Sequence, residues 1–215
     1  KSGYPINTHA LYYAALRMSG EGARAARVKK LINGGGPSYL ALYDERRGYY
    51  LPWAWKNHPN GRLEDHWFDT LGNLLAIVTG LATPKISVSI LRHIEKTRIN
   101  RPYPCKAIYP AIEKGDTEWH PYFETSDSRT PYEYLNGGIW PFIGGFYVAA
   151  LVKAGKLLKA KQELELLAKA NHLVGGDAAA EQGLLRKHEG VRGLGEPWGF
   201  HEWLHGKTGR PMGQS

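Results

Sequence analysis

The sequence has little of what holds small secreted domains or metal clusters together, since Cys105 is the one cysteine among its 215 residues. A single thiol excludes an internal disulfide framework and a cysteine-based metal site. Long apolar runs are also missing, because no stretch approaches the roughly 20 apolar residues that a membrane-spanning helix needs. No apolar core follows Lys1–Pro5, so we expect no signal peptide. These absences favour a cytoplasmic protein without a metal or another cofactor.

Positive charge is plentiful, and the formal net charge is +8. The basic residues are nevertheless spread over many segments, and in Arg24–Lys30 and Lys153–Lys161 they alternate with apolar residues at helical spacing. That pattern is typical of solvated helix faces. No DNA- or RNA-binding motif accompanies it. We therefore expect no nucleic acid and no membrane as a partner, and a homo-oligomer is compatible with the sequence.

Aromatic residues are numerous, with seven Trp and thirteen Tyr, and they collect in connecting segments. Examples are Tyr49–Trp55, Trp119–Tyr122 and Trp198–Trp203. Flat aromatic rings in loops stack on ligands with little loss of side-chain entropy. Sugar rings present apolar C–H faces, so these segments favour a small carbohydrate as ligand. The alternative is that the rings simply pack the loops.

The apolar periodicity is mostly helical. It predicts helices over residues 9–18, 22–32, 68–81, 85–96, 140–153 and 157–173. Between Tyr39 and Trp55 the pattern changes, and it predicts a short β-hairpin instead. Pro141 suits the first turn of its helix, where its missing N–H costs nothing.

The order of these elements points to one architecture. The helices come in pairs that are separated alternately by short turns and by long aromatic loops, as in an all-α (α/α)6 toroid. Six helices are half of what a closed double ring requires. We therefore expect residues 1–215 to form a single domain, a partial α/α-barrel catalytic domain with a small β-hairpin insertion and with parts missing at each end.

Three segments, in order along the chain, carry a family resemblance. The first is Asp65–Leu74, with its helix pair joined at Ala82–Lys85. The second is Asn136–Pro141, and the third is Glu202–Arg210, followed by Gly213-Gln214. Together they resemble the alkaline and neutral invertase family and the related bacterial amylo-α-1,6-glucosidase-like proteins, here the C-terminal part of such a barrel.

This resemblance implies a six-hairpin glycosidase that hydrolyses a glycosidic bond with inversion. Glu202 falls on the position of the catalytic base, and Asp65, Asn136 and Trp140 fall on positions that line the sugar pocket. The family's general acid is an aspartate upstream of all three motifs, and we expect it to lie before Lys1. Further residues that we expect to contact the substrate are His66, His201, Trp203 and Gln214.

The sequence departs from the family around the expected sugar site. Leu135 stands where the family usually has His, and the flanks of Glu202 are His201 and Trp203–His205. These changes affect substrate specificity and leave the carboxylate in place. The sequence therefore predicts hydrolysis of a small α-glucoside, such as sucrose or a short oligosaccharide. The alternatives are an exo-acting α-glucan or glucosylglycerate-type hydrolase, and a carbohydrate-binding scaffold without turnover.

Residue chemistry alone also selects Glu202, because apolar walls and nearby imidazoles can shift the pKa of a carboxyl group in either direction. Glu196 is the nearest rival, and a solvated loop glutamate is the plainer interpretation. Other candidate residues have structural alternatives. Asp65 or Asp69 suits a helix cap as well as a ligand site. His201 and His205 have metal-ligand spacing only if they lie on a helix, which nearby glycines disfavour. Asn136–Gly138 resembles an ordinary tight turn.

Overall fold

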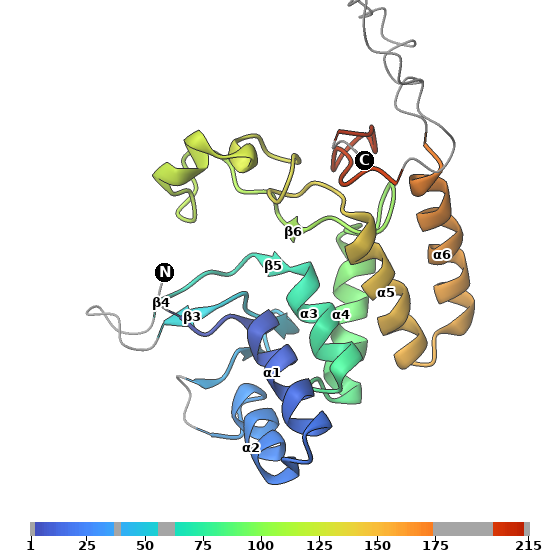
Figure 1. The fold of residues 1–215 in the computed structure, drawn as a ribbon. Helices are drawn as coiled ribbons and strands as arrows, with labels where there is room; N and C mark the ends of the chain where they lie inside the picture. Colours follow the sequence, from blue (N-terminus) through green and yellow to red (C-terminus); the bar gives the residue numbers. More distant parts are fainter. Residues whose placement is uncertain (1–2, 37–39, 56–62, 174–199, 213–215) are drawn as a thin grey trace, which may run out of the picture.

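A computed structural model describes residues 3–36, 40–55, 63–173 and 200–212 of the chain. Within them lie six α-helices in three antiparallel pairs (Figure 1). The pairs are α1 (Ile6–Met18) with α2 (Gly22–Ile32), α3 (Thr70–Thr79) with α4 (Pro84–Lys96), and α5 (Pro141–Lys153) with α6 (Leu157–Asn171). The six predicted helices are thus confirmed, with boundaries that differ by up to three residues.

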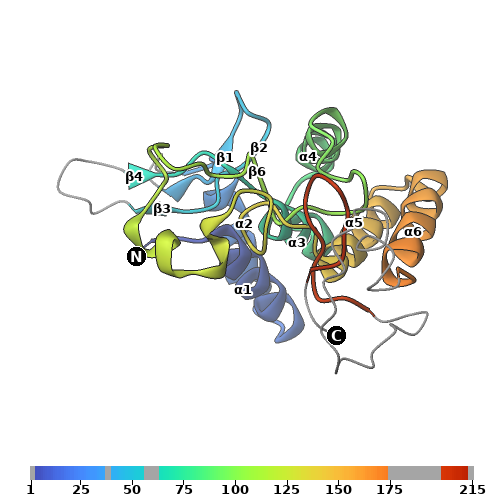
Figure 2. The ribbon, with the colours of Figure 1, turned by 90° about the horizontal axis from the view of Figure 1, so that it is seen from above.

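The first helix of each pair belongs to a central row. Helix α3 packs against α1 on one side and α5 on the other, while α2 covers α1 and α6 covers α5 (Figure 2). This placement explains the apolar character of α3, in which Leu74, Leu75, Ala76 and Ile77 are all buried. Helix α4 buries one face, through Ile86, Ile90, Leu91 and Ile94, and exposes the other.

Short turns join the helices of each pair at one end of the molecule. The turn between α3 and α4 runs from Gly80, in the left-handed conformation at φ 82°, to Thr83, whose hydroxyl accepts a hydrogen bond from the Ile86 N–H. Glycine tolerates this conformation, and threonine is a favoured helix N-cap. The long connections that contain β5, β6 and residues 200–212 lie at the opposite end (Figure 1). This agrees with the predicted alternation of short turns and long loops.

Three short antiparallel strand pairs lie in the long connections. The predicted hairpin is present as β1 (Tyr43–Asp44) and β2 (Tyr49–Tyr50), in which Tyr43 pairs with Tyr50. Two further pairs were not expected from the sequence. They are β3 (Ala54–Trp55) with β4 (Leu63–Glu64), and β5 (Phe68–Asp69) with β6 (Ile108–Tyr109). Strands of two residues are too short to show an alternating pattern. Two short 3-10 helices, η2 (Pro121–Thr125) and η3 (Asp127–Arg129), complete the long loop.

A buried amide attaches the hairpin to the central helix. Asn73 on α3 is fully buried, and its Oδ1 accepts a hydrogen bond of 2.9 Å from the Tyr50 N–H. Its Nδ2 donates to the carbonyl oxygens of Tyr50 at 3.0 Å and Asp69 at 2.9 Å. The first motif therefore also positions the hairpin. No helix in the described ranges has the length and apolarity needed to cross a membrane.

Candidate active site

Backbone hydrogen bonds bring the three motifs side by side at the rim of the long loops. Asp69 in the first motif pairs with Ile108, and the Ala107 N–H donates to the carbonyl of Gly138 at 2.8 Å. Ile139 and Leu204 then exchange two hydrogen bonds of 2.8 Å, which joins the second motif to the third. We call this series of contacts the rim ladder. It places segments that are far apart in the sequence in fixed register.

Asp65 lies in a tryptophan-lined part of this rim. The residue is 9% exposed, and its Oδ2 accepts hydrogen bonds from the indole N–H groups of Trp53 and Trp67, the second at 3.3 Å. A cavity of about 320 Å³ lies here, with Trp53, Trp67 and Asp69 among its lining residues. The neighbouring residue, His66, accepts a hydrogen bond of 2.7 Å from the Tyr49 hydroxyl through its carbonyl. Aromatic faces beside a carboxylate have the composition of a sugar-binding wall.

Asp69 is a helix cap. Its Oδ1 accepts a hydrogen bond of 3.0 Å from the Gly72 N–H at the start of α3. Burial raises the pKa of its carboxyl group to about 6, although the N–H groups of Gly72 and Leu71 oppose that rise. Of the two aspartates for which the sequence left capping open, Asp69 has this role. Asp65 faces the indoles instead.

Asn136 anchors the long loop. It is 1% exposed, and its Oδ1 accepts a hydrogen bond of 2.7 Å from the Ile112 N–H. Its Nδ2 donates to the carbonyls of Ile112 at 2.8 Å and Ser128 at 3.1 Å. The tight turn continues at Gly137, with φ 88°. These backbone contacts occupy both ends of the amide, and a contact with sugar stays a prediction.

Three aromatic rings form a wall between the second and third motifs. The Trp140 indole N–H donates to the Tyr134 carbonyl at 2.9 Å, and the two rings meet edge to face with centroids 5.1 Å apart. The rings of Trp203 and Tyr134 also meet edge to face, with centroids 6.0 Å apart. Tyr134 was not among the predicted site residues. Its signal in the sequence is its place in an aromatic loop, whereas its backbone conformation, with φ 44°, cannot be read from the sequence.

Glu202 occupies an exposed position next to this wall. Its carboxylate forms no hydrogen bond or ion pair with another residue in the described ranges. Its backbone is nevertheless fixed, because Leu204 is bonded to Ile139 and the Met212 N–H donates to the Trp203 carbonyl at 3.1 Å. His201, the residue before it, contacts the Leu173 carbonyl through Nε2 at 3.0 Å. The rival Glu196 and the predicted ligand Gln214 lie outside the described residues.

The residues that depart from the family pattern differ in burial and in their contacts. Leu135 is half exposed, whereas Leu204 is fully buried and packs with Ile139. His205 accepts hydrogen bonds from the N–H groups of Lys207 and Thr208 through Nδ1, both at 3.2 Å, and so shapes a turn. Burial lowers the pKa of its imidazole. In the parts of the chain with described coordinates, no three His, Cys, Asp or Glu residues gather as they would around a metal.

The fold is that of the α/α-toroid glycosidases. A solved structure with this similarity is the GH63 mannosylglycerate hydrolase from Thermus thermophilus in complex with glucose, at a TM-score of 0.55 and 16% identity. The match covers 98% of this chain and 44% of that one. At this identity the likeness concerns the fold alone.

The chain belongs to the alkaline and neutral invertase family, whose profile matches residues 35–182. Cytosolic invertase 1 of Oryza sativa subsp. japonica is 32% identical over 155 residues, which cover 71% of this chain and 23% of that protein. Probable alkaline/neutral invertase D of Arabidopsis thaliana is 31% identical over 171 residues, or 79% of this chain and 26% of that protein. The chain thus spans about a quarter of these relatives. The matched range includes the first two motifs and ends before Glu202.

Proposed function

We propose that the protein to which this chain belongs is an inverting glycoside hydrolase, with Glu202 as its catalytic base. The observation that carries the proposal is the rim ladder, which holds the segment of Glu202 beside the wall of Tyr134, Trp140 and Trp203. The family membership of the chain supports the same reaction class.

The proposed chemistry uses an exposed carboxylate on a fixed backbone. In inverting hydrolysis one carboxylic acid protonates the leaving oxygen, while a carboxylate on the opposite face removes a proton from the attacking water. The two groups stand about 6.5–9.5 Å apart to make room for that water. Glu202 has the free oxygen lone pairs that the second role needs. We assign the acid to a part of the protein outside this chain.

For the substrate we propose a small α-glucoside such as sucrose. The names of the curated relatives as invertases support it, and so do the tryptophans beside Asp65, which suit a neutral ring. The exposed Leu135 stands where the family usually has His, a departure that bears on specificity for sucrose. The first alternative is an exo-acting α-glucan or glucosylglycerate-type hydrolase. A binding protein without turnover is the remaining alternative.

The test is replacement of Glu202 by Gln in the complete protein. Gln keeps the size and removes the basicity, so hydrolysis should fall about 10²-fold or more while sugar affinity changes far less. Glu165→Gln on the exposed face of α6 is the matched control and should retain normal turnover. NMR of the first sugar released from an α-glucoside should show the β-anomer. A near-normal rate for Glu202→Gln would exclude it as the base, and the α-anomer as first product would exclude inversion.

The compartment is a further proposal. The relatives include a protein named cytosolic and others named chloroplastic or mitochondrial. We propose that this protein lies in the cytoplasm, by analogy with cytosolic invertase 1 of rice. Fractionation of the source cells with an antibody against the chain tests this, and recovery in an organelle or in the medium would contradict it.

A further inference from the structure

A second, strongly basic pocket lies behind the turn that follows Glu202. Its volume is about 560 Å³, and it lies between the end of α4 and residues 206–207. Four of its lining residues are cationic and none is acidic: Arg98, Arg101, Lys106 and Lys207. Nothing in the proposed hydrolysis of a neutral sugar uses these charges.

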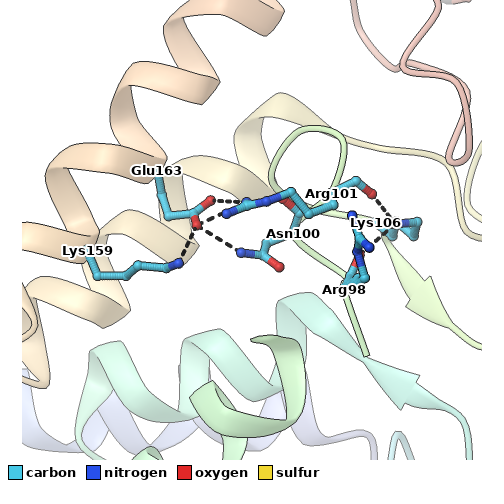
Figure 3. Close-up of polar contacts among 6 residues, drawn as sticks. All are labelled: Arg98, Asn100, Arg101, Lys106, Lys159 and Glu163. Carbon is cyan, nitrogen blue, oxygen red and sulfur yellow. Dashed lines mark hydrogen bonds and ion pairs between the residues drawn. The ribbon is translucent and has the colours of Figure 1, made fainter. Parts of the chain in front are cut away.

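Lys106 is the buried member of the group. It is 8% exposed, and its Nζ donates hydrogen bonds to the backbone carbonyls of Arg98, at 2.9 Å, and Arg101 (Figure 3). Burial lowers the pKa of its amine to about 8, and the positive charges of Arg98 and Arg101 act in the same direction. The carbonyls supply partial charges only, and this amine forms no ion pair with a carboxylate in the described part of the chain.

The nearest acid is already engaged elsewhere. Glu163 on α6 is fully buried and binds Arg101, with Nη1 at 3.1 Å from Oε1 and 3.0 Å from Oε2 (Figure 3). It also accepts a hydrogen bond from Asn100 at 2.8 Å and pairs with Lys159 at 3.3 Å. Among the described residues no carboxylate pairs with Arg98, Lys106 or Lys207. Within those ranges, three of the four cations of the pocket therefore lack a carboxylate partner, and the Lys207 ammonium lies 4.1 Å from the centroid of the Tyr132 ring.

Arg98 stands at a position that favours glycine. It follows the C-cap of α4 with φ 58°, in the left-handed conformation that a Cβ disfavours. The Ile99 N–H donates to the Ile94 carbonyl at 3.1 Å, as is usual for this helix ending. Glycine would satisfy the same backbone without strain. An arginine here therefore carries a backbone strain that glycine would avoid.

We propose that this pocket binds a phosphate dianion, either inorganic phosphate or the phosphate group of a sugar phosphate. Guanidinium groups bind phosphate through paired, charge-assisted hydrogen bonds, and lysines add point charges. The volume is large enough for a phosphate that carries a small organic group. Because Gly206 and Lys207 form one wall, the bound anion ties the turn after Glu202 to the end of α4.

Isothermal titration calorimetry of the complete protein at constant ionic strength tests the site. Inorganic phosphate and glucose 6-phosphate are titrated separately, with chloride and glucose as controls. We expect saturable binding of at least one phosphate compound and none of chloride. Glucose carries no charge and tests the candidate sugar site. Its binding or lack of binding therefore bears on the proposed hydrolase and not on the phosphate site. If both phosphate compounds fail to bind, or if chloride competes equally, the proposal is refuted.

Two variants locate the binding. Arg98→Gln should weaken phosphate binding about 10-fold or more, the scale of one lost charge-assisted contact. Arg27→Gln removes the same charge from the exposed face of α2 and should bind as the parent does. Arg98→Gly relieves the left-handed residue, so it should raise the melting temperature and still lose binding. Equal weakening by Arg27→Gln, or full binding by Arg98→Gly, would overturn the assignment.

Discussion

Replacement of Asn136 by Ala separates an anchoring role from a sugar-binding role. The substitution leaves the N–H and the C=O of Ile112 without their partners, in a backbone segment that is buried. Each buried polar group left unsatisfied costs about 1–3 kcal/mol, so the pair costs about 2–6 kcal/mol. The free energy of unfolding of a native domain is about 5–15 kcal/mol, so the variant should still fold but with a marked loss of stability. Gln162→Ala, on the exposed face of α6, is the matched amide control.

Two measurements read the outcome. Urea unfolding should show the loss for Asn136→Ala and a change within about 0.5 kcal/mol for Gln162→Ala. Native-state hydrogen exchange should show that the Ile112 amide loses protection, because its acceptor is gone. If the loop opens locally, the second effect appears without the first. A variant of parental stability with a protected Ile112 amide and weakened sugar binding would refute the anchoring role and favour direct contact with sugar.

Two further predictions concern buried carboxyl groups. Asp69 has a folded-state pKa of about 6, above the usual 3.8, so the folded protein binds its proton more tightly and stability should fall as pH rises from about 4 to 6. Asp69→Asn should flatten that part of the urea-unfolding profile, whose slope reaches about 1.4 kcal/mol per pH unit, and an unchanged profile would contradict the assignment. Glu163→Gln removes the charge shared by Arg101 and Lys159 and should cost about 2–3 kcal/mol, the scale of lost charged hydrogen bonds. The exposed Glu165→Gln should cost far less, and equal losses would show that the buried network contributes nothing.

The helices of this chain could be read from the sequence because their ends are marked by local chemistry. Gly80 and Thr83-Pro84 stop one helix and start the next, and the predicted boundaries there are close to those observed. Phe68 and Asp69 were predicted as helix and are strand β5 instead. Their partners are Ile108 and Tyr109, and no local sequence pattern predicts pairing between segments so far apart in the chain.

The arrangement of the candidate site could not be predicted from the sequence. The three motifs were found by resemblance, whereas their common register depends on hydrogen bonds between distant backbone segments. The roles of Asn136 and Asp69 also depend on which backbone groups lie within reach. Lys106 was missed altogether, although a lysine inside the apolar run Cys105–Ile108 is a usable signal of a buried charge.

The rim ladder makes the candidate site more fragile than the helices below it. Each helical pair closes over a short turn, whereas the contact between Ile139 and Leu204 requires closure of a long stretch of chain. Long closures cost more conformational entropy and form late in folding. Mild denaturation should therefore release the segment of Glu202 first, while most of the helical signal persists. The arrangement of the candidate site is therefore lost before the helices unfold. Far-UV circular dichroism, which measures the helices, would not detect that loss.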